Sequence, residues 1–281
     1  MITAAIIVLR EVFEAALIIG IVLAGTRGVP RRGLWVCTGV AAGALGAVAV
    51  AAGAGRLAAA FEGNGQDLFN AGILLLATAM LGWHNVWMRR HGRGRAREIQ
   101  SVGEHVTSGR SPRSALFLVV MLAVLREGSE VVLFLYGVAA GGATAPQLWL
   151  GSLAGLLAGV AIGAVVYLGL ARVPQRHLFA VTGALLLLIA AGMAAQAAGY
   201  LVQAGLLPAL ADPLWDSSRW LPERGPPGQL LHALTGYVER PSGMQLVFFV
   251  SVAAGLLVLT RGSRGPAPAR TAARRPRSPR S

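Results

Sequence analysis

Two stretches of the chain decide the fold: LREVFEAALIIGIVLAG at residues 9–25 and LREGSEVVLFLYGVAAG at residues 125–141. They share eight identical residues in 17 positions when Arg10 is aligned with Arg126. Both place the pentapeptide R-E-x-x-E inside an apolar run, and the next apolar run after each opens with Leu-Trp. The sequence therefore predicts a duplicated unit whose first helix carries charged residues.

The apolar runs of this chain are long enough to cross a lipid bilayer. Of the 281 residues, 55% are apolar and 13% are charged, whereas soluble domains carry about 25% charged residues. A spanning helix needs roughly 20 apolar residues in a row and satisfies its own backbone hydrogen bonds. Seven runs qualify, at residues 2–25, 33–55, 68–88, 114–140, 148–171, 178–206 and 244–260. We expect an all-α polytopic membrane protein with seven transmembrane helices.

The duplication groups six of these helices into two units. Repeat one covers about residues 2–88 and repeat two about residues 114–206, while helix seven at 244–260 stands outside the repeat. Because each unit has three helices, an odd number, the second copy enters the membrane from the opposite side, as in many transporters. We expect one membrane domain over residues 1–261 and a disordered cytoplasmic tail, rich in Arg and Pro, over 262–281.

Basic residues mark the cytoplasmic side. The first, third and fifth connections hold three, seven and two arginines, and the tail after Thr260 holds seven more. The second, fourth and sixth connections are neutral or acidic in balance. This alternation predicts an N-terminus outside the cell membrane and a C-terminus inside. For the net charge of +13, the position of the basic residues matters more than the sum. The arginines of the tail are expected to contact anionic lipid of the inner leaflet, and nucleic acid is not an expected partner.

Six charged residues lie in the middle of the first and fourth spans: Arg10, Glu11, Glu14, Arg126, Glu127 and Glu130. Each would cost about 2.5 to 3.5 kcal/mol if it faced lipid, which excludes lipid exposure for the set. At 100° per residue, Arg10 and Glu14 lie 40° apart around the helix, and Glu11 and Glu14 lie 60° apart. We therefore expect all six to face the bundle interior near the membrane midplane.

Four carboxylates against two guanidinium groups leave a charge of −2 in this interior. Carboxylate oxygens are hard ligands that suit hard cations. A zinc or copper site is not expected, because the sequence has no paired histidines and only one cysteine, Cys37. We expect Glu11, Glu14, Glu127 and Glu130 to bind a metal ion, with Arg10 and Arg126 fixing carboxylate rotamers. The alternative is purely structural, with Arg10–Glu14 and Arg126–Glu130 as buried salt bridges, but it leaves two glutamates without partners.

The two R-E-x-x-E motifs in the first and fourth of seven spans resemble the oxidase-dependent iron permeases of bacteria and fungi. The resemblance covers about residues 1–261 and includes WMRRHGR at 87–93, LWDSS at 214–218 and GQLLHALTGYVERPSG at 228–243. It implies that the four glutamates handle iron and that both arginines are essential. It also implies an extracytoplasmic oxidase or peroxidase and an iron-binding protein as partners, with iron as the substrate and no permanently bound cofactor.

We therefore expect a multi-pass iron permease that imports Fe³⁺ formed or delivered at the outer face. One alternative is a proton-coupled carrier of another divalent metal, since buried glutamates also relay protons. Another is a membrane subunit that anchors an extracytoplasmic oxidase without transporting an ion. No nucleophile and base arrangement or cofactor fingerprint indicates an enzyme.

Other residues give predictions about the entrance, the interior of the bundle and the packing of its helices. Four outer acids could attract cations at the entrance, or could simply be solvated loop charges: Glu62, Asp67, Asp212 and Asp216. His84 and Asn85 are expected to be hydrogen-bonded residues of the bundle, with the lining of an inner exit as the alternative. Glycines at every fourth position of the fifth span, from Gly151 to Gly163, indicate close packing of helices.

Overall fold

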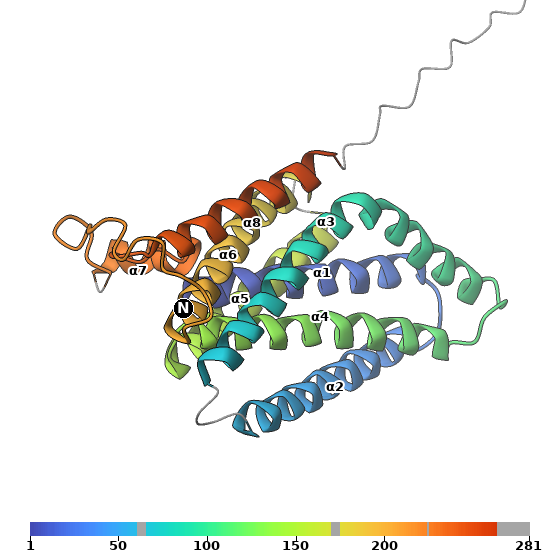
Figure 1. Cartoon of the computed structure of the whole chain (residues 1–281). Coiled ribbons are helices and arrows are strands. Elements are labelled where there is room, and N and C mark those ends of the chain that lie inside the picture. The colour runs from blue at the N-terminus through green and yellow to red at the C-terminus, as the bar shows by residue number, and fades with distance from the viewer. Residues whose placement is uncertain (61–65, 170–174, 224, 263–281) are drawn as a thin grey trace, which may run out of the picture.

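The structure is a computed structural model that describes residues 1–60, 66–169, 175–223 and 225–262. Within these ranges the regular secondary structure is entirely helical (Figure 1). The helices are α1 (Ile2–Gly25), α2 (Arg32–Ala60), α3 (Gln66–Thr107), α4 (Ser114–Ala140), α5 (Ala145–Tyr167), α6 (Gln175–Gln203), α7 (Pro226–Thr235) and α8 (Gly243–Gly262). Glu62 and the expected tail from residue 263 onwards lie outside the described residues, whereas Gly262 is the last residue of α8.

The helices confirm a polytopic membrane protein. Five segments are long and apolar enough to cross a membrane, within α2, α3, α5, α6 and α8. The helices α1 and α4 are as long, but every stretch of 18 residues in either one contains the three charges of its R-E-x-x-E motif. The charges of the two motifs therefore account for the absence of α1 and α4 from these five apolar segments.

Several helix ends differ from those of the predicted spans, and the largest difference is at α3. The third run was expected to end at residue 88, but α3 continues to Thr107 because the arginine-rich segment after its apolar part remains helical. Arg and Ala are good helix formers, and the extension is held at its end, where the Thr107 hydroxyl donates to the Gly25 carbonyl at 3.3 Å. The fifth helix ends at Tyr167, ahead of the expected residue 171.

The short helix α7 was not expected. It begins with two prolines at its first positions and is followed by Gly236, which adopts a left-handed conformation with φ of 66°. Proline at the start and glycine just past the end are the usual boundary signals of a helix. With ten residues, α7 is too short to cross a membrane, so the lengths of the apolar runs did not predict it.

Close packing at glycines joins the two halves of the chain: α5 lies against α1, and α2 lies against α4. A Cβ atom added at Gly43 would lie 2.7 Å from the Met121 carbonyl oxygen, and one added at Gly155 would lie 2.5 Å from that of Ala5. Met121 and Ala5 are 116 positions apart, the same offset that aligns the two R-E-x-x-E motifs. The prediction of glycine-mediated helix packing is confirmed.

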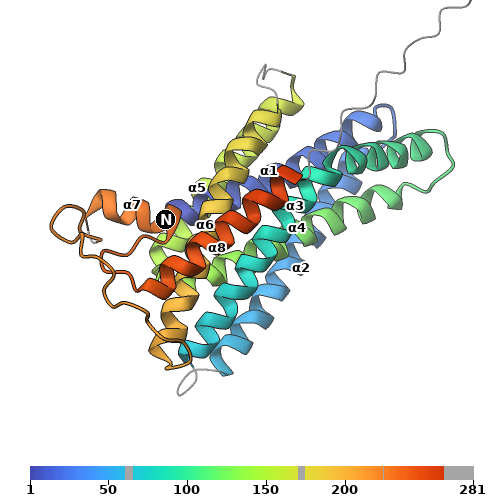
Figure 2. The same cartoon turned by 45° about the horizontal axis from the view of Figure 1, so that its top comes forward.

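Different segments of the chain lie at the two ends of the helix bundle. Figure 1 shows the N-terminus of the chain at the same end as α7, and Met1, the turn at residues 141–142 and α7 line one common pocket there. We call this the N-terminal end of the bundle. The opposite end holds the turn after α1 and the last part of α3, which changes direction past the apolar part of that helix (Figures 1 and 2).

Candidate metal site in the bundle

The first R-E-x-x-E motif is buried in the middle of α1. The side chains of Arg10, Glu11 and Glu14 are 3%, 0% and 3% exposed. The Arg10 guanidinium reaches both acids: Nη1 lies 2.9 Å from Glu11 Oε1, and Nη2 lies 2.8 Å from Glu14 Oε1. One guanidinium therefore orients two carboxylates at once, a geometry that its planar fork allows.

The second motif, in α4, has a different arrangement. Arg126 Nε donates to Glu130 Oε1 at 3.0 Å, and the guanidinium carbon lies 4.9 Å from the centroid of the Trp87 ring of α3. The Arg126 side chain is 39% exposed, whereas Glu127 is buried. The two salt bridges of the structural alternative, Arg10–Glu14 and Arg126–Glu130, are thus formed, but only the first is buried on both sides.

His84 of α3 connects the acids of the two motifs. Its Nε2 lies 3.3 Å from Glu14 Oε2 and 3.9 Å from Glu11 Oε2, while its Nδ1 contacts Glu130 Oε2. The imidazole is 3% exposed. His84 therefore lies between acidic side chains of α1 and α4, although sequence reasoning did not include it among the metal ligands.

The backbone of α3 is fixed near His84 by its neighbour. Asn85 Nδ2 donates to the Gly183 carbonyl of α6 at 2.9 Å, which satisfies a polar side chain at this depth. One turn earlier, Leu81 is buried in the core formed with α1, α4 and α6. These contacts set the rotation of α3, and that rotation directs His84 toward α1 and α4.

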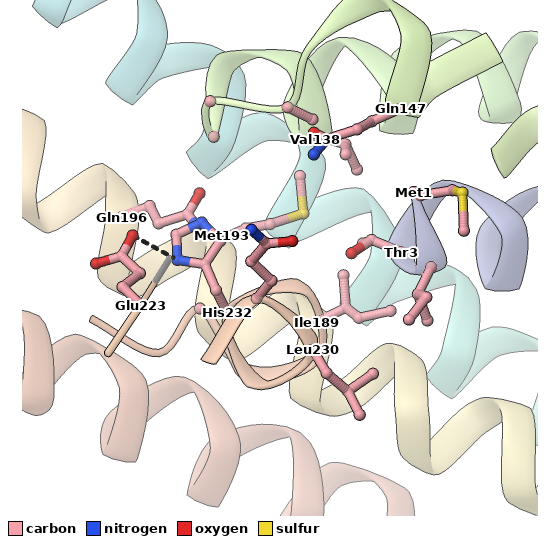
Figure 3. A pocket seen from close by; sticks show the side chains of 16 residues that line it. Met1, Thr3, Val138, Gln147, Ile189, Met193, Gln196, Glu223, Leu230 and His232 are labelled. Atoms are coloured by element: carbon pink, nitrogen blue, oxygen red, sulfur yellow. Dashed lines mark hydrogen bonds and ion pairs between the residues drawn. The ribbon is translucent and has the colours of Figure 1, made fainter. Parts of the chain in front are cut away.

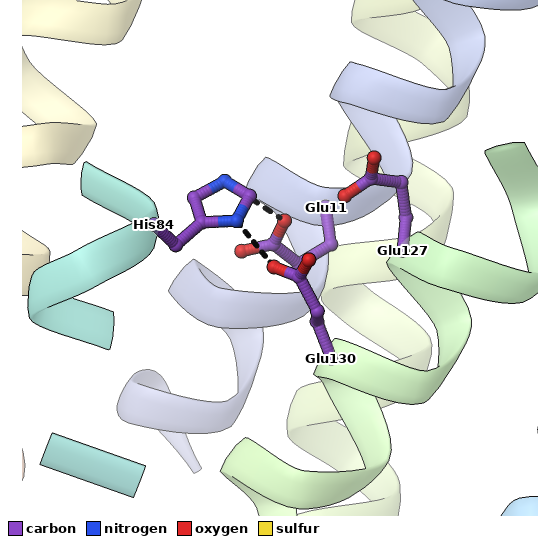
Figure 4. Close-up of side chains that lie close together, drawn as sticks. All are labelled: Glu11, His84, Glu127 and Glu130. Carbon is purple, nitrogen blue, oxygen red and sulfur yellow. Dashed lines mark ion pairs between the residues drawn. The ribbon is translucent and has the colours of Figure 1, made fainter. Parts of the chain in front are cut away.

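Four side chains come close enough to share one ion (Figure 4). Glu11, His84, Glu127 and Glu130 each offer one ligand atom, and these atoms all lie within 4.8 Å of one another. We call these four residues the central cluster. Three carboxylates and an imidazole are the ligand types that iron accepts, and the set draws on three helices, α1, α3 and α4. Glu14 lies beside the cluster, between Arg10 and His84.

The sequence of the chain matches the model of the Iron permease FTR1 family over residues 1–261. The chain belongs to the Iron permease FTR1 family. Curated relatives include the ferrous iron permease EfeU of Escherichia coli O6:H1, 32% identical over 274 residues, which cover 94% of this chain and 97% of the relative. The EfeU of Yersinia pestis is 28% identical over 281 residues, 98% of each chain. No solved structure matches the chain.

Family membership confirms three predictions from the sequence. The chain is an iron permease that imports iron, it is a multi-pass membrane protein, and it is a transporter rather than an enzyme. The resemblance drawn from the two R-E-x-x-E motifs was therefore correct.

An apolar layer separates the central cluster of the permease from the N-terminal end of the bundle. It consists of buried residues from α1, α3, α4 and α6: Ile7, Ala77, Leu81, Phe134, Ile189 and Met193. Ile7, Leu81 and Phe134 each lie about one helical turn from Glu11, His84 and Glu130, respectively, on the side of the N-terminal end. Buried apolar side chains therefore lie between that end of the bundle and the cluster.

Three of the four acids expected at the entrance of the permease lie within the described residues. Asp67, Asp212 and Asp216 are exposed and are not brought together with the central cluster. Asp216 accepts hydrogen bonds from the hydroxyl and the backbone N–H of Ser218 at 2.6 and 3.0 Å, and it pairs with Arg240 at 3.0 Å. These contacts lower the pKa of the Asp216 carboxyl, and the Arg240 charge offsets its attraction for a cation.

Proposed function

We propose that iron crosses the membrane of the cell through the central cluster. The observation that carries this proposal is the burial of Glu11, His84, Glu127 and Glu130 around one point in the middle of three helices. Burying several carboxylates without compensation is costly. A bound cation offsets that cost, and a permease must hold its ion somewhere inside the bundle.

In this proposal each side chain has a defined task. The carboxylates and the imidazole replace part of the water shell of the ion. Arg10 fixes Glu11 and Glu14, and Arg126 fixes Glu130, through the ion pairs described above. With His84 neutral, the four glutamates and two arginines sum to −2, which attracts a cation but leaves the loaded site weakly charged, so that the ion can leave again.

The ion at this cluster is Fe³⁺ in our proposal. Carboxylate oxygens favour hard cations, and Fe³⁺ is the harder of the two iron ions. The relatives are named ferrous iron permeases, and oxidation at the outer face would convert ferrous iron to this form. An extracytoplasmic oxidase or peroxidase and an iron-binding protein are the corresponding partners.

The transport path follows from an inverted repeat with the N-terminus outside. Two observations support the repeat: the two R-E-x-x-E motifs align at an offset of 116 residues, and each motif helix packs against glycines of the second helix of the other unit, α1 against α5 and α4 against α2. The arginine distribution supports the orientation. The N-terminal end of the bundle is then the outer end, and the apolar layer closes the outer path. Rocking of one repeat against the other opens this layer as the inner path closes.

Uptake of radiolabelled iron by proteoliposomes tests the function of the cluster. We expect Glu11→Gln and Glu127→Gln to reduce uptake strongly, because each removes one charged ligand while keeping side-chain shape. The control is Glu104→Gln, which changes an exposed acid on the extension of α3. Wild-type uptake in both cluster variants at equal abundance would refute the cluster as the path of the ion.

A further inference from the structure

A pocket opens at the N-terminal end of the bundle, on the far side of the apolar layer from the central cluster. It has a volume of about 440 Å³ and is lined by the start of α1, the turn between α4 and α5, α6 and α7. Its polar side chains include Gln196, Glu223 and His232 (Figure 3). Ile189 and Met193 line the pocket and also belong to the apolar layer, so only that layer separates the pocket from the cluster.

The hydrogen bonds of His232 fix which ring nitrogen carries the proton. Its Nδ1 lies 2.7 Å from the carbonyl oxygen of Tyr237. A carbonyl oxygen can only accept, so Nδ1 must donate the hydrogen. In the neutral imidazole, Nε2 then has a free lone pair. This nitrogen faces Gln196, whose Nε2 lies 3.4 Å away, a long contact for a hydrogen bond.

Glu223 lies on the other side of the same ring. Its Oε1 is 3.3 Å from His232 Nδ1, and the backbone N–H of Glu223 donates to Glu239 Oε2 at 2.9 Å, which ties the loop before α7 to the loop after it. A histidine that binds a metal through one nitrogen usually gives the hydrogen of the other to a carboxylate or a backbone carbonyl. His232 has both of these partners at Nδ1.

We propose that this pocket is a second metal site, in which His232 binds a first-row transition-metal ion through Nε2 before the ion reaches the central cluster. The Gln196 amide, turned by half a rotation, presents its oxygen to the same ion, and water completes the shell. Glu223 is a positioning residue that holds the tautomer of His232. The role of the pocket in uptake rests on the proposed function, in which the N-terminal end faces outward.

This arrangement suits an initial binding site. One imidazole, one amide oxygen and water bind an ion more weakly than a cluster of carboxylates, so the ion can move on when the apolar layer opens. An imidazole ligand also favours iron over Ca²⁺ and Mg²⁺, which prefer all-oxygen sites. The pocket would therefore select for transition metals before the ion is committed to transport.

Co²⁺ is the probe for this site, because its visible absorption changes when an imidazole nitrogen binds. The full chain is titrated in detergent, in a Glu11→Gln, His84→Ala background that disables the central cluster. We expect one bound Co²⁺ with nitrogen ligation, loss of this signal in His232→Ala, and at least about tenfold weaker binding in Glu223→Gln. The control is His105→Ala, which changes an exposed histidine at the opposite end of the bundle.

Unchanged Co²⁺ binding in both pocket variants would overturn the proposal. Glu223→Gln keeps the size of the side chain, so a loss of affinity there cannot be ascribed to a collapsed α7. Uptake provides a second measurement in the otherwise unchanged chain: His232→Ala should raise the KM for iron about tenfold and leave the maximal rate close to that of the wild type. The titration reports on the pocket even if the central cluster is not the transport site.

Discussion

Arg10 and Arg126 hold equivalent places in the two R-E-x-x-E motifs, but Arg10 is 3% exposed and Arg126 is 39% exposed. Arg10 pairs with two carboxylates, whereas Arg126 pairs with Glu130 and lies over the Trp87 ring. An exactly symmetric bundle would give both arginines the same surroundings. The two motifs therefore have different surroundings, although they share the same five-residue pattern.

The two arginines should therefore respond differently to substitution by lysine. Arg10→Lys keeps the charge but cannot hold Glu11 and Glu14 together, and a hydrogen bond between charged groups contributes about 1.5 to 3 kcal/mol. We expect iron uptake to fall about 10- to 100-fold. Arg126→Lys loses one such bond and the ring contact, so we expect a smaller decrease. Initial rates in proteoliposomes give the comparison.

Arg113→Lys is the matched control for this pair, since Arg113 is exposed and precedes α4. It should transport iron at the wild-type rate. Equal, large losses in Arg10→Lys and Arg126→Lys would contradict the functional difference between the two sites. Wild-type rates in both would show that positive charge alone is sufficient.

His84 should be required for uptake as strongly as a glutamate of the cluster. His84→Ala removes a ligand nitrogen and the group that lies between Glu14 and Glu130. We expect uptake at limiting iron to fall at least about 100-fold, because outer-shell partners of metal ligands alone change affinity 10- to 100-fold. Initial rates are compared with those of His105→Ala. Uptake above one tenth of the wild-type rate in His84→Ala would exclude a ligand role.

The acids of the site could be predicted from sequence, whereas His84 could not be placed. Charges inside two apolar runs are expected to face inward. The four glutamates and Arg10 are buried as expected, whereas Arg126 is 39% exposed. The direction of His84 depends on the rotation of α3, which is set by contacts with α6 that are far away in the sequence, including Asn85 with Gly183. A polar residue in an apolar run signals an inward position but does not identify its partners.

The helix order and the apolar parts of the spans could also be predicted, because lipid imposes length and hydropathy on each helix. The continuation of α3 to Thr107 and the helix α7 could not, since neither segment has the length and hydropathy that a membrane span imposes. Their boundaries depend on capping and on packing against other segments. The pocket around His232 could not be predicted either, because its walls depend on the same packing between segments.

The glycine contacts predict that alanine substitution destabilises the protein at a packed glycine but not at a glycine with open space around it. Gly155→Ala places a Cβ atom 2.5 Å from the Ala5 carbonyl oxygen, and Gly43→Ala places one 2.7 Å from that of Met121. Overpacking of this kind costs about 1 to 3 kcal/mol. Gly53→Ala meets nothing within 4 Å and should keep or raise the stability. We expect thermal unfolding in detergent to show a lower Tm for the first two variants only, and an equal Tm in all three would refute close packing.

The orientation predicts opposite positions for two reporters. A reporter fused after Thr260 should be cytoplasmic, and one inserted near Gly225, just before α7, should be external. Enzymatic reporters that are active on only one side of the membrane give this assignment directly. An external reporter after Thr260 would reverse the proposed orientation and would place the pocket around His232 at the cytoplasmic exit.

Ion selectivity is expected to follow from the ligand types of the central cluster. Three carboxylates and one imidazole bind Fe³⁺ more strongly than Ca²⁺ or Mg²⁺, because Fe³⁺ is the more acidic ion and accepts both oxygen and nitrogen ligands. Attraction to a site of −2 also rises with the charge of the ion. The loss of hydration rises with charge as well, so the ligand types decide the preference. We expect Fe³⁺ to compete with radiolabelled iron far better than Ca²⁺ or Mg²⁺ at equal free concentration.

Two substitutions separate the contributions of charge and ligand type to this preference. Glu11→Asp and Glu127→Asp keep the charge and shorten the ligand, so some uptake and the order of competitors should be retained. Replacing Glu11 with Gln in a chain that keeps Glu127 should weaken the preference for Fe³⁺ in whatever uptake remains, because one negative charge is lost. The measurement is the initial rate of uptake in vesicles with each competitor added outside. Equal inhibition by Ca²⁺ and Fe³⁺ in the wild type would contradict the ferric proposal and favour a general carrier of divalent cations.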